Sequence, residues 1–375
     1  MVDACKMCES ARKLRDTYAI RPGITLFKKE FGYYCLEEWY NQGLSRDADL
    51  AKIFDYDPPG HVAVCGLGGC QPAFFPAFEE RLIQDRGDTE IVQDSAGRHV
   101  LYFKGRRNGF MPEYIDHPVK DWKTWEGNVK WRLNPETPGR SDYLPEALSI
   151  IKPAEAEGKM LAQGIAGAYM YLRCLFGPEK VLYAFYDNPK LVHDCMQTWL
   201  KLSDSVTALH QKHFTIDLLS IDEDICYNHG PLISPDMIRE FLFPYYQQLI
   251  GNMKLRQLDR SRHLYVQVDT DGFANSVIPI YMKGIGMDSM APFEVAAGCN
   301  VVEIGKAFPD LVISGGIDKR VLAAGKEAID IHLEAIIPTM RKRGGYIPTC
   351  DHGVPAEVSL QNYIYYRKRC VELGG

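Results

Sequence analysis

Acidic, thiol and imidazole side chains gather at the ends of short apolar runs in the second half of the chain. Five of these runs end in, or lead to, Asp222-Glu223-Asp224, Asp269-Thr270-Asp271, Glu294, Asp318 and Cys350-Asp351-His352. A single acid after a strand is explained by a helix cap, as for Asp222 or Asp318, but several reactive groups at each of several strand ends point to chemistry. Carboxylates packed together repel each other, so some must be protonated, paired or bound to a cation.

Two kinds of chemistry suit such a set. Carboxylates and a thiolate can hold Zn²⁺ in a tetrahedral site that keeps one position open for substrate. Alternatively, Glu223 and His352 can act as general acid and general base on an organic substrate. The residue types alone leave both alternatives open.

Repeated strand and helix units are the elements that would bring these groups together. From about residue 160, apolar runs alternate with amphipathic stretches at a spacing typical of a parallel sheet. The runs cover Met160–Ala166, Leu218–Asp222, Leu264–Val268, Met287–Pro292, Leu311–Ser314 and Tyr346–Pro348, and the amphipathic stretches include Pro189–His213, Pro235–Arg256 and Lys319–Arg341. With an earlier strand near Val62–Val64, they predict a closed barrel whose C-terminal strand ends meet on one catalytic face.

The first 150 residues follow a different pattern, rich in aromatic residues, proline and glycine. Two β-type runs around a glycine-containing turn predict a β-hairpin near residues 90–103. We therefore expect residues 1–150 to form an N-terminal elaboration that packs on or covers the barrel. Residues 151–375 would form the main part of the barrel and carry the active site. Aromatic residues such as Trp39 can line a substrate pocket, although core packing explains them equally well.

Composition excludes several classes of protein. The net charge of −6 and the scattered basic residues argue against a nucleic-acid partner. The sequence contains no run of about 18 apolar residues, so no membrane helix is expected, and the N-terminus lacks the apolar core of a signal peptide. The 11 scattered cysteines favour free thiols in a reducing compartment, so we expect a cytoplasmic protein. No glycine-rich nucleotide loop opens a helix.

The second half of the chain resembles the uroporphyrinogen decarboxylase superfamily over residues 160–373. The resemblance rests on ordered segments: Leu175–Glu179 with Asp187–Pro189, Glu223–Ile225 with Gly230–Pro235, Asp269–Gly272, Pro292–Glu294, Gly315–Lys319, and Gly344–Pro348 with Asp351–Pro355. It implies an α/β fold of the (β/α)8 TIM-type barrel class, with an N-terminal elaboration. The superfamily contains porphyrinogen decarboxylases and corrinoid-dependent methyltransferases.

The sequence departs from the decarboxylases near its N-terminus. They carry an Arg-rich segment that grips substrate carboxylates, whereas residues 18–27 contain only Arg21. The motif-bearing face is acidic, and a tetrapyrrole with eight carboxylates calls for a basic cleft. The sequence is therefore more similar to the methyltransferase branch, of the O-demethylase methyltransferase I type.

Several members of that branch bind Zn²⁺ through a His-x-Cys pair and a later Cys. Here Asp269 and Asp271 replace the pair, and Cys350 falls close to the later Cys. An oxygen-rich site suits an ether oxygen better than a thiol, so we expect a small methoxy compound, an aryl methyl ether, as methyl donor. The resemblance implies a Zn²⁺ held by some of Asp269, Asp271, Glu294 and Cys350.

The expected reaction moves a methyl group from the ether to the Co(I) corrinoid of a partner protein. The metal would polarise the ether oxygen, and Glu223 or His352 would supply a proton to the leaving phenolate. Asp224, Asp351 and Trp39 are the expected substrate-binding residues.

Two alternatives remain at this point. A metal-independent decarboxylase or lyase would use Glu223, Asp271 and His352 for acid–base work on a different small substrate. A corrinoid-binding module without enzyme activity fits less well, because the Asp-x-His-x-x-Gly signature of such modules is missing. Relatives include dimers, so a homodimer is a further expectation.

Overall fold

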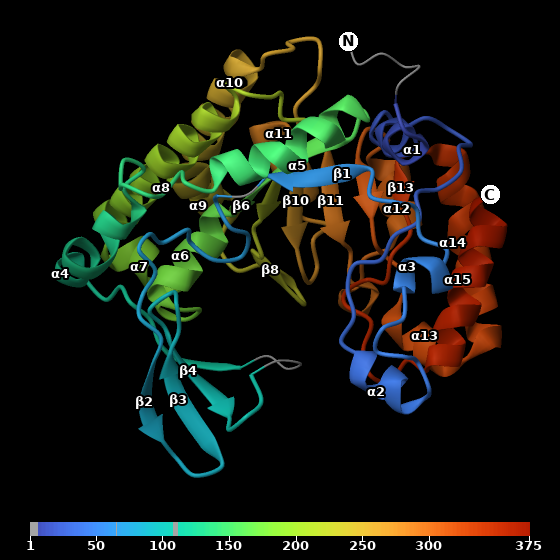
Figure 1. Ribbon diagram of the computed structural model, residues 1–375, viewed down its shortest axis with the longest axis horizontal. Coiled ribbons are helices and arrows are strands. Elements are labelled where there is room, and N and C mark those ends of the chain that lie inside the picture. Colours follow the sequence, from blue (N-terminus) through green and yellow to red (C-terminus); the bar gives the residue numbers. More distant parts are fainter. Residues whose placement is uncertain (1–6, 65, 108–111) are drawn as a thin grey trace.

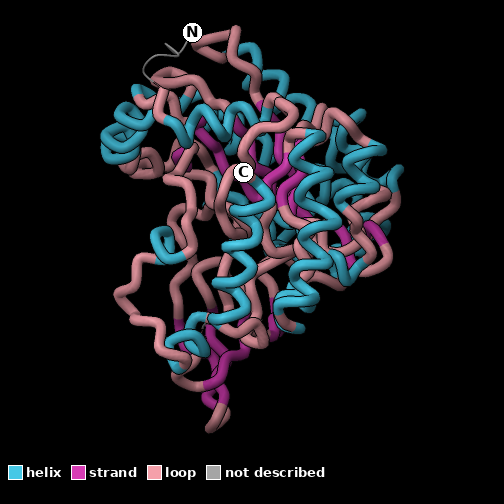
Figure 2. Tube along the Cα trace, turned by 90° about the vertical axis from the view of Figure 1, so that its right-hand side faces the viewer, coloured by secondary structure: helices cyan, strands magenta, loops and turns pink. Residues whose placement is uncertain are grey.

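The centre of the molecule is a curled parallel β-sheet surrounded by helices, in a computed structural model that describes residues 7–64, 66–107 and 112–375. Helices lie on the outside of the strands (Figure 1; Figure 2). The sheet has the order β1 (His61–Val64), β6 (Met160–Ala166), β7 (Leu218–Asp222), β10 (Tyr265–Thr270), β11 (Ser289–Pro292), β12 (Val312–Ser314), β13 (Tyr346–Ile347). The prediction of a barrel-like α/β fold is confirmed.

Strand β10 shows why these sequences form barrel strands. Its even-numbered residues Val266, Val268 and Thr270 are buried against the outer helices, while Gln267 and Asp269 face the inside and keep partial exposure. This alternation follows from the two-residue period of a strand. The parallel register sets Asp269 beside the last residue of β7 and so brings carboxylates together at one end of the sheet.

The part of the chain that the structure describes contains seven barrel strands, not the eight of an ideal TIM-type barrel. An extended segment, residues 24–31, fills the gap between the edge strands β1 and β13. The Lys28 N–H donates to the Asp57 carboxylate at 2.7 Å, and the Glu30 carboxylate accepts from the Cys350 N–H at 2.8 Å. Because none of these partners belongs to β1 or β13, the segment does not join the backbone ladder of the sheet.

The outer helices follow the expected amphipathic stretches, but a π-helical turn interrupts Pro235–Arg256 and Gly325 interrupts Lys319–Arg341. They are α5 (Leu144–Ala156), α6 (Ala168–Phe176), α7 (Lys180–Asp187), α8 (Pro189–His210), α9 (Pro235–Met237), η3 (Ile238–Leu242), α10 (Phe243–Arg256), α11 (Ile278–Ile285), α12 (Val301–Ala307), α13 (Lys319–Ala324), α14 (Lys326–Arg343) and α15 (Leu360–Gly374). Gly325, with φ of 119°, separates α13 from α14, and Asp318 caps α13 through the Arg320 N–H. No helix in the described ranges is long and apolar enough to cross a membrane.

An antiparallel sheet projects from the barrel as an arm, below it in Figure 1. Its order is β2 (Arg81–Asp85), β3 (Thr89–Gln93), β4 (His99–Phe103), β5 (Glu113–Asp116). The hairpin expected near residues 90–103 is its central pair, with Gln93 opposite His99. The first 150 residues therefore supply the arm and also one barrel strand, β1. Shorter elements are α1 (Glu9–Tyr18), α2 (Leu36–Asn41), α3 (Leu50–Ile53), α4 (Trp122–Thr124), η1 (Trp125–Val129), η2 (Lys130–Leu133), β8 (Cys226–Tyr227), β9 (Gly230–Pro231) and η4 (Val295–Ala297).

Helix α1 closes the N-terminal end of the barrel. Its residues Leu14 and Tyr18 form a small apolar cluster with Phe27 and with the first residues of β6 and β7, Met160 and Leu218. This plug leaves the C-terminal strand ends as the open face of the barrel.

Candidate active site

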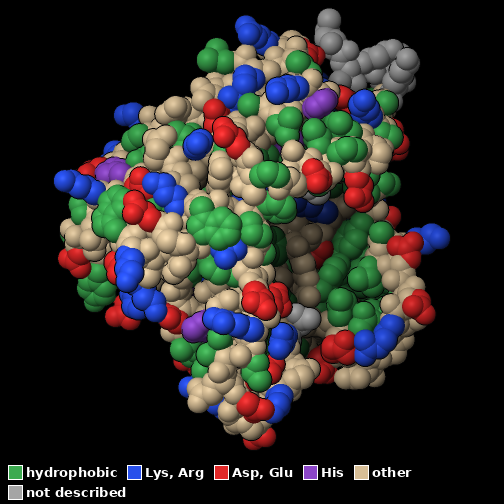
Figure 3. Space-filling view, turned by 60° about the vertical axis from the view of Figure 1, so that its left-hand side comes forward, with side chains coloured by type: hydrophobic (Ala, Val, Ile, Leu, Met, Phe, Trp, Pro, Cys, Tyr) green, Lys and Arg blue, Asp and Glu red, His purple; other side chains and the backbone are tan. Residues whose placement is uncertain are grey.

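A cavity of about 350 Å³ lies at the C-terminal strand ends, between the barrel and the arm. Figure 3 shows the molecule hollowed beside the arm. The barrel wall contains Asp222, Asp224, Asp269, Asp271 and His352, and the arm side contributes Arg98, Tyr114 and His117. Both halves of the chain thus enclose one space, large enough for a small organic molecule.

The three acids that end β7 do not face the same way. Asp222 and Asp224 line the cavity, but Glu223 lies between them and points into the helix layer, where it reaches Tyr246 of α10 and Tyr281 of α11. Glu223 has no exposed surface and accepts hydrogen bonds from the Tyr246 and Tyr281 hydroxyls. Burial raises the pKa of Glu223 to about 7. The structure therefore places this expected proton donor outside the cavity.

Asp269 is enclosed by other carboxylates on the cavity wall. Its pKa is raised to about 8. Burial is the largest cause, and the nearby charges of Asp271, Asp222 and Asp224 add to the increase. Its carboxyl group makes no hydrogen bond or ion pair with a side chain in the described part of the chain. Burial and the neighbouring carboxylates therefore favour the protonated form of Asp269, which lies on the cavity wall where a proton donor would act.

His352 lies across the cavity entrance as a paired imidazole. Its Nε2 atom is 3.5 Å from Asp271 Oδ2, and the rings of Phe31 and Tyr34 lie 5.3 and 5.6 Å from the imidazole. The interaction with Asp271 raises the pKa of His352 against the opposing effect of burial. The charged imidazolium is therefore favoured beside the reacting groups.

Replacing Asp271 with Asn should lower the pKa of His352, because the carboxylate that stabilises the imidazolium is lost. Titration of the histidine resonances by NMR measures this change directly. The resonances of histidines far from the cavity serve as the internal control. An unchanged His352 titration would show that this ion pair does not form in solution.

Both arginines of the cavity wall already have partners. Arg173 of α6 pairs with Asp224, and Arg98 of the arm pairs with Asp94 at 2.6 Å. A cysteine at the rim, Cys70, donates its thiol to Asp222 at 3.6 Å. No local signal in the sequence marks these residues, because the arm and α6 reach the cavity only through tertiary packing.

Glu294 and Asp351 connect the loops that surround the cavity. Glu294 accepts from the Gly272 N–H at 2.9 Å and from Lys319 Nζ at 2.8 Å. Asp351 is fully buried and accepts from the N–H groups of Val295 and Lys319 at 2.9 and 3.1 Å. Neither carboxylate lines the cavity, so the geometry gives them a positioning role instead of the expected metal and substrate contacts.

Cys350 and Trp39 also lie away from the cavity. Cys350 is fully buried, and burial raises the pKa of its thiol strongly. Trp39 is buried in an aromatic cluster with Phe54 and Tyr363, and its indole N–H donates to the Val358 carbonyl at 2.8 Å. The structure places both residues in the packing of the barrel.

The four expected metal ligands do not come together. Asp269 and Asp271 face the cavity. Glu294 is instead paired with Lys319, and Cys350 is buried outside the cavity wall. Within residues 7–64, 66–107 and 112–375, no group of three or more His, Cys, Asp and Glu side chains is arranged to hold a metal ion. Protein zinc sites use three or four such donors, so these residues do not fit the Zn²⁺ site that the resemblance implied.

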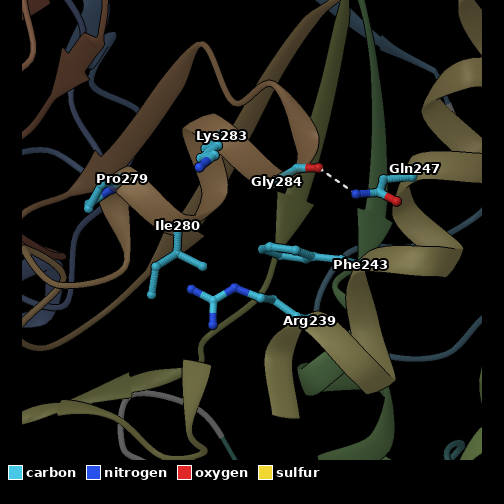
Figure 4. A pocket seen from close by; sticks show the side chains of 7 residues that line it. All are labelled: Arg239, Phe243, Gln247, Pro279, Ile280, Lys283 and Gly284. Carbon is cyan, nitrogen blue, oxygen red and sulfur yellow. Dashed lines mark hydrogen bonds between the residues drawn. The ribbon is translucent and has the colours of Figure 1, made fainter. Parts of the chain in front are cut away.

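A larger groove, of about 530 Å³, lies on the outer surface between α10 and α11 (Figure 4). Phe243 and Ile280 form its apolar part, and Arg239 and Lys283 supply its charges. It contains no carboxylate, histidine or cysteine in its lining. Acid–base chemistry therefore belongs to the smaller cavity at the strand ends.

Comparison with known proteins shows similarity to one family of enzymes. The pattern of the family described as uroporphyrinogen decarboxylase (URO-D) matches residues 105–371. Uroporphyrinogen decarboxylases of Geobacter metallireducens and Geobacter sulfurreducens are each 24% identical, over 242 and 277 residues. These alignments cover 61% and 70% of this chain, and 65% and 73% of the relatives, so the first spans slightly less than two thirds of its relative.

Among solved structures, a methyltransferase from Methanosarcina mazei has the same fold. The TM-score is 0.60 at 14% sequence identity, and the superposition covers 97% of this chain and 98% of the other. The similarity thus includes the N-terminal part as well as the barrel.

Proposed function

Because this chain belongs to the uroporphyrinogen decarboxylase family, we propose that it is a methyltransferase that takes the methyl group of a small aryl methyl ether and passes it to the Co(I) corrinoid of a partner protein. The observation that carries the proposal is the position of the Asp269 carboxyl among Asp222, Asp224 and Asp271 on the wall of a small cavity, where burial and these charges raise its pKa. An ether oxygen is a poor leaving group, and a proton donor removes the charge that develops on it. The methyltransferase from Methanosarcina mazei, which shares the fold, supports this choice within the family.

In the proposed reaction, Asp269 is the proton donor. The bond between the methyl carbon and the oxygen breaks, the bonding electrons stay on the oxygen, and this oxygen takes the Asp269 proton. The imidazolium of His352, held by Asp271, stabilises the negative charge as it forms. The partner's corrinoid supplies the nucleophile that accepts the methyl group. No step uses Zn²⁺, because the expected ligands do not converge.

A decarboxylase function has the names of the curated relatives in its favour. The charges of the cavity oppose it for a porphyrinogen substrate. Four aspartates face the cavity, and its two arginines are already paired with Asp94 and Asp224. A tetrapyrrole with eight carboxylates calls for a basic cleft, and neither arginine of this lining is unpaired.

An anoxic assay with purified protein, a Co(I) corrinoid and a panel of methoxy aromatics tests the proposal. Methylcobalamin together with free phenol supports it. Carbon dioxide release without cobalt alkylation supports the decarboxylase, and the absence of both products overturns the methyl-ether donor. Full activity after chelation is the expected result of acid assistance, whereas loss of activity restored by Zn²⁺ would contradict it.

A further inference from the structure

A second cavity, of about 280 Å³, lies inside the barrel beneath the active-site cavity. We call it the inner chamber, and its polar lining comprises Tyr18, Lys29, His61, Ser220, Asp222 and Gln267. Small barrels usually fill this space with side chains. Here Ala63, Ala162 and Gly164 face inward and are too small to fill it. Asp222 lies in the walls of both cavities and marks where they adjoin.

Lys29 is the basic residue that lines the inner chamber. It is enclosed on all sides, yet it keeps accessible surface because its side chain lies against the chamber. Its ammonium makes no ion pair or hydrogen bond with the described residues, whereas its neighbours Lys28 and Glu30 point outward and are bound by Asp55 and Tyr363. Burial lowers the pKa of Lys29, and the nearby charges of Glu30 and Asp269 oppose that effect only in part, so an anion in the chamber would further offset the cost of burying the ammonium.

Uncharged donors surround the lysine. Gln267 Oε1 accepts from the Tyr18 hydroxyl at 2.8 Å, which leaves the amide NH2 group without an acceptor in the described chain. The Ser220 hydroxyl likewise has no protein partner there. Burial lowers the pKa of His61 to about 4, so its imidazole is neutral. The chamber therefore offers one cation and two free donors, and its one lining carboxylate, Asp222, lies where it adjoins the active-site cavity.

The distribution of polarity along the barrel axis gives the chamber a direction. Leu14, Phe27, Leu218 and Ile347 make its closed end apolar. Lys29 and the free donors lie above this plug, and the carboxylates lie at the open face. A partner protein can reach only the open face, so a methyl group bound for it must point outward, and the rest of the donor molecule must point inward.

We propose that the inner chamber binds the carboxylate of an aromatic acid, and that the methyl donor is a methoxybenzoate with its two substituents at opposite ends of the ring. This inference rests on the function proposed above and assigns its substrate class. Lys29 pairs with the carboxylate, and the Gln267 amide and the Ser220 hydroxyl donate to it. The ring passes Asp222, and the methoxy oxygen reaches Asp269.

Calorimetric titration of the whole protein with 4-methoxybenzoate, benzoate and methoxybenzene tests the assignment. Lys29→Met removes the charge at nearly constant volume, and Lys28→Met is the matched control on the outer side of the same segment. We expect both carboxylates to bind the wild type, with affinities about 10- to 100-fold weaker in Lys29→Met and within about twofold of wild type in Lys28→Met. Equal affinities in Lys29→Met and wild type, no binding of benzoate, or equally tight binding of methoxybenzene would overturn the assignment.

Benzoate separates this inference from the proposed function, because it has no methyl group to transfer. Lys29-dependent binding of benzoate without any methyl transfer would retain the chamber and reject the methyltransferase. Equal demethylation of a neutral methoxyarene by wild type and Lys29→Met, with no preference for the acid, would retain the methyltransferase and reject the chamber. Lys29→Gln provides a second variant, and circular dichroism melts confirm that each variant is folded.

Discussion

Asp269→Asn should slow methyl transfer by about 10²- to 10⁴-fold, the usual contribution of a general acid. Asparagine keeps the shape of the side chain but has no acidic proton for the leaving oxygen. The wild-type rate should also fall as pH rises through about 8, since Asp269 then loses its proton. The variant should lose the part of this decline that Asp269 causes and keep only the part that follows deprotonation of His352.

The measurement is the rate of methyl transfer for a series of methoxyarenes whose phenols differ in acidity. Weakly acidic phenols need the proton most, so their ethers should lose the most activity in the variant. Asp88→Asn, an exposed aspartate in a turn of the arm, is the control. A uniform loss across the series, or a variant with near wild-type rates, would contradict the assignment of Asp269 as proton donor.

The same variant should not lose stability, which separates the chemical effect from misfolding. The folded-state pKa of Asp269 lies above its ordinary value. As pH rises from about 4 to about 8, Asp269 ionises in the unfolded chain but keeps its proton in the folded protein, so the free energy of unfolding falls. Asparagine avoids this cost. Its free energy of unfolding should match wild type in acid and exceed it by about 2–4 kcal/mol above pH 8.

Glu223→Ala should lower the free energy of unfolding by about 3–5 kcal/mol and leave the rate per folded molecule within about threefold of wild type. The loss has two parts, an unfilled volume and two buried tyrosine hydroxyls, Tyr246 and Tyr281, without an acceptor. Urea denaturation followed by fluorescence measures stability, and the methyl-transfer assay measures rate below the unfolding transition.

Glu303→Ala, which removes an exposed carboxylate on α12, is the matched control and should change stability by less than about 1 kcal/mol. Glu223→Gln keeps the volume and one acceptor, so its effect should be intermediate. A rate loss of 100-fold with unchanged stability would return Glu223 to the role of proton donor.

The sequence predicted the barrel well where apolar runs end abruptly. The bounds of β6 and β7 agree with the expected runs, because buried parallel strands are nearly continuous in apolar residues and stop at polar ones. Residues 24–31 were not predicted as part of the barrel wall. Three consecutive charged residues, Lys28 to Glu30, are typical of a surface loop, and only the folded chain shows that Lys29 faces inward.

The candidate site, like the fold, could be predicted from the sequence only in part. The sequence places Glu223 between Asp222 and Asp224 at the end of a strand, but it does not say which of the three side chains faces the cavity. Lys319 binds Glu294 from the next loop, a contact across 25 positions that spacing does not reveal. The corrinoid protein, the homodimer and the division at residue 150 stay predictions.

The arm gives the molecule a division of labour. The groups that can move protons come from barrel strand ends after residue 220, whereas Arg98, Tyr114 and His117 reach the same cavity from a separate antiparallel sheet. Substitutions in that sheet can reshape the entrance without touching the barrel strands. In evolutionary terms, the shape of the entrance and the reaction chemistry are encoded in different stretches of the gene, so one can diverge while the other is held constant.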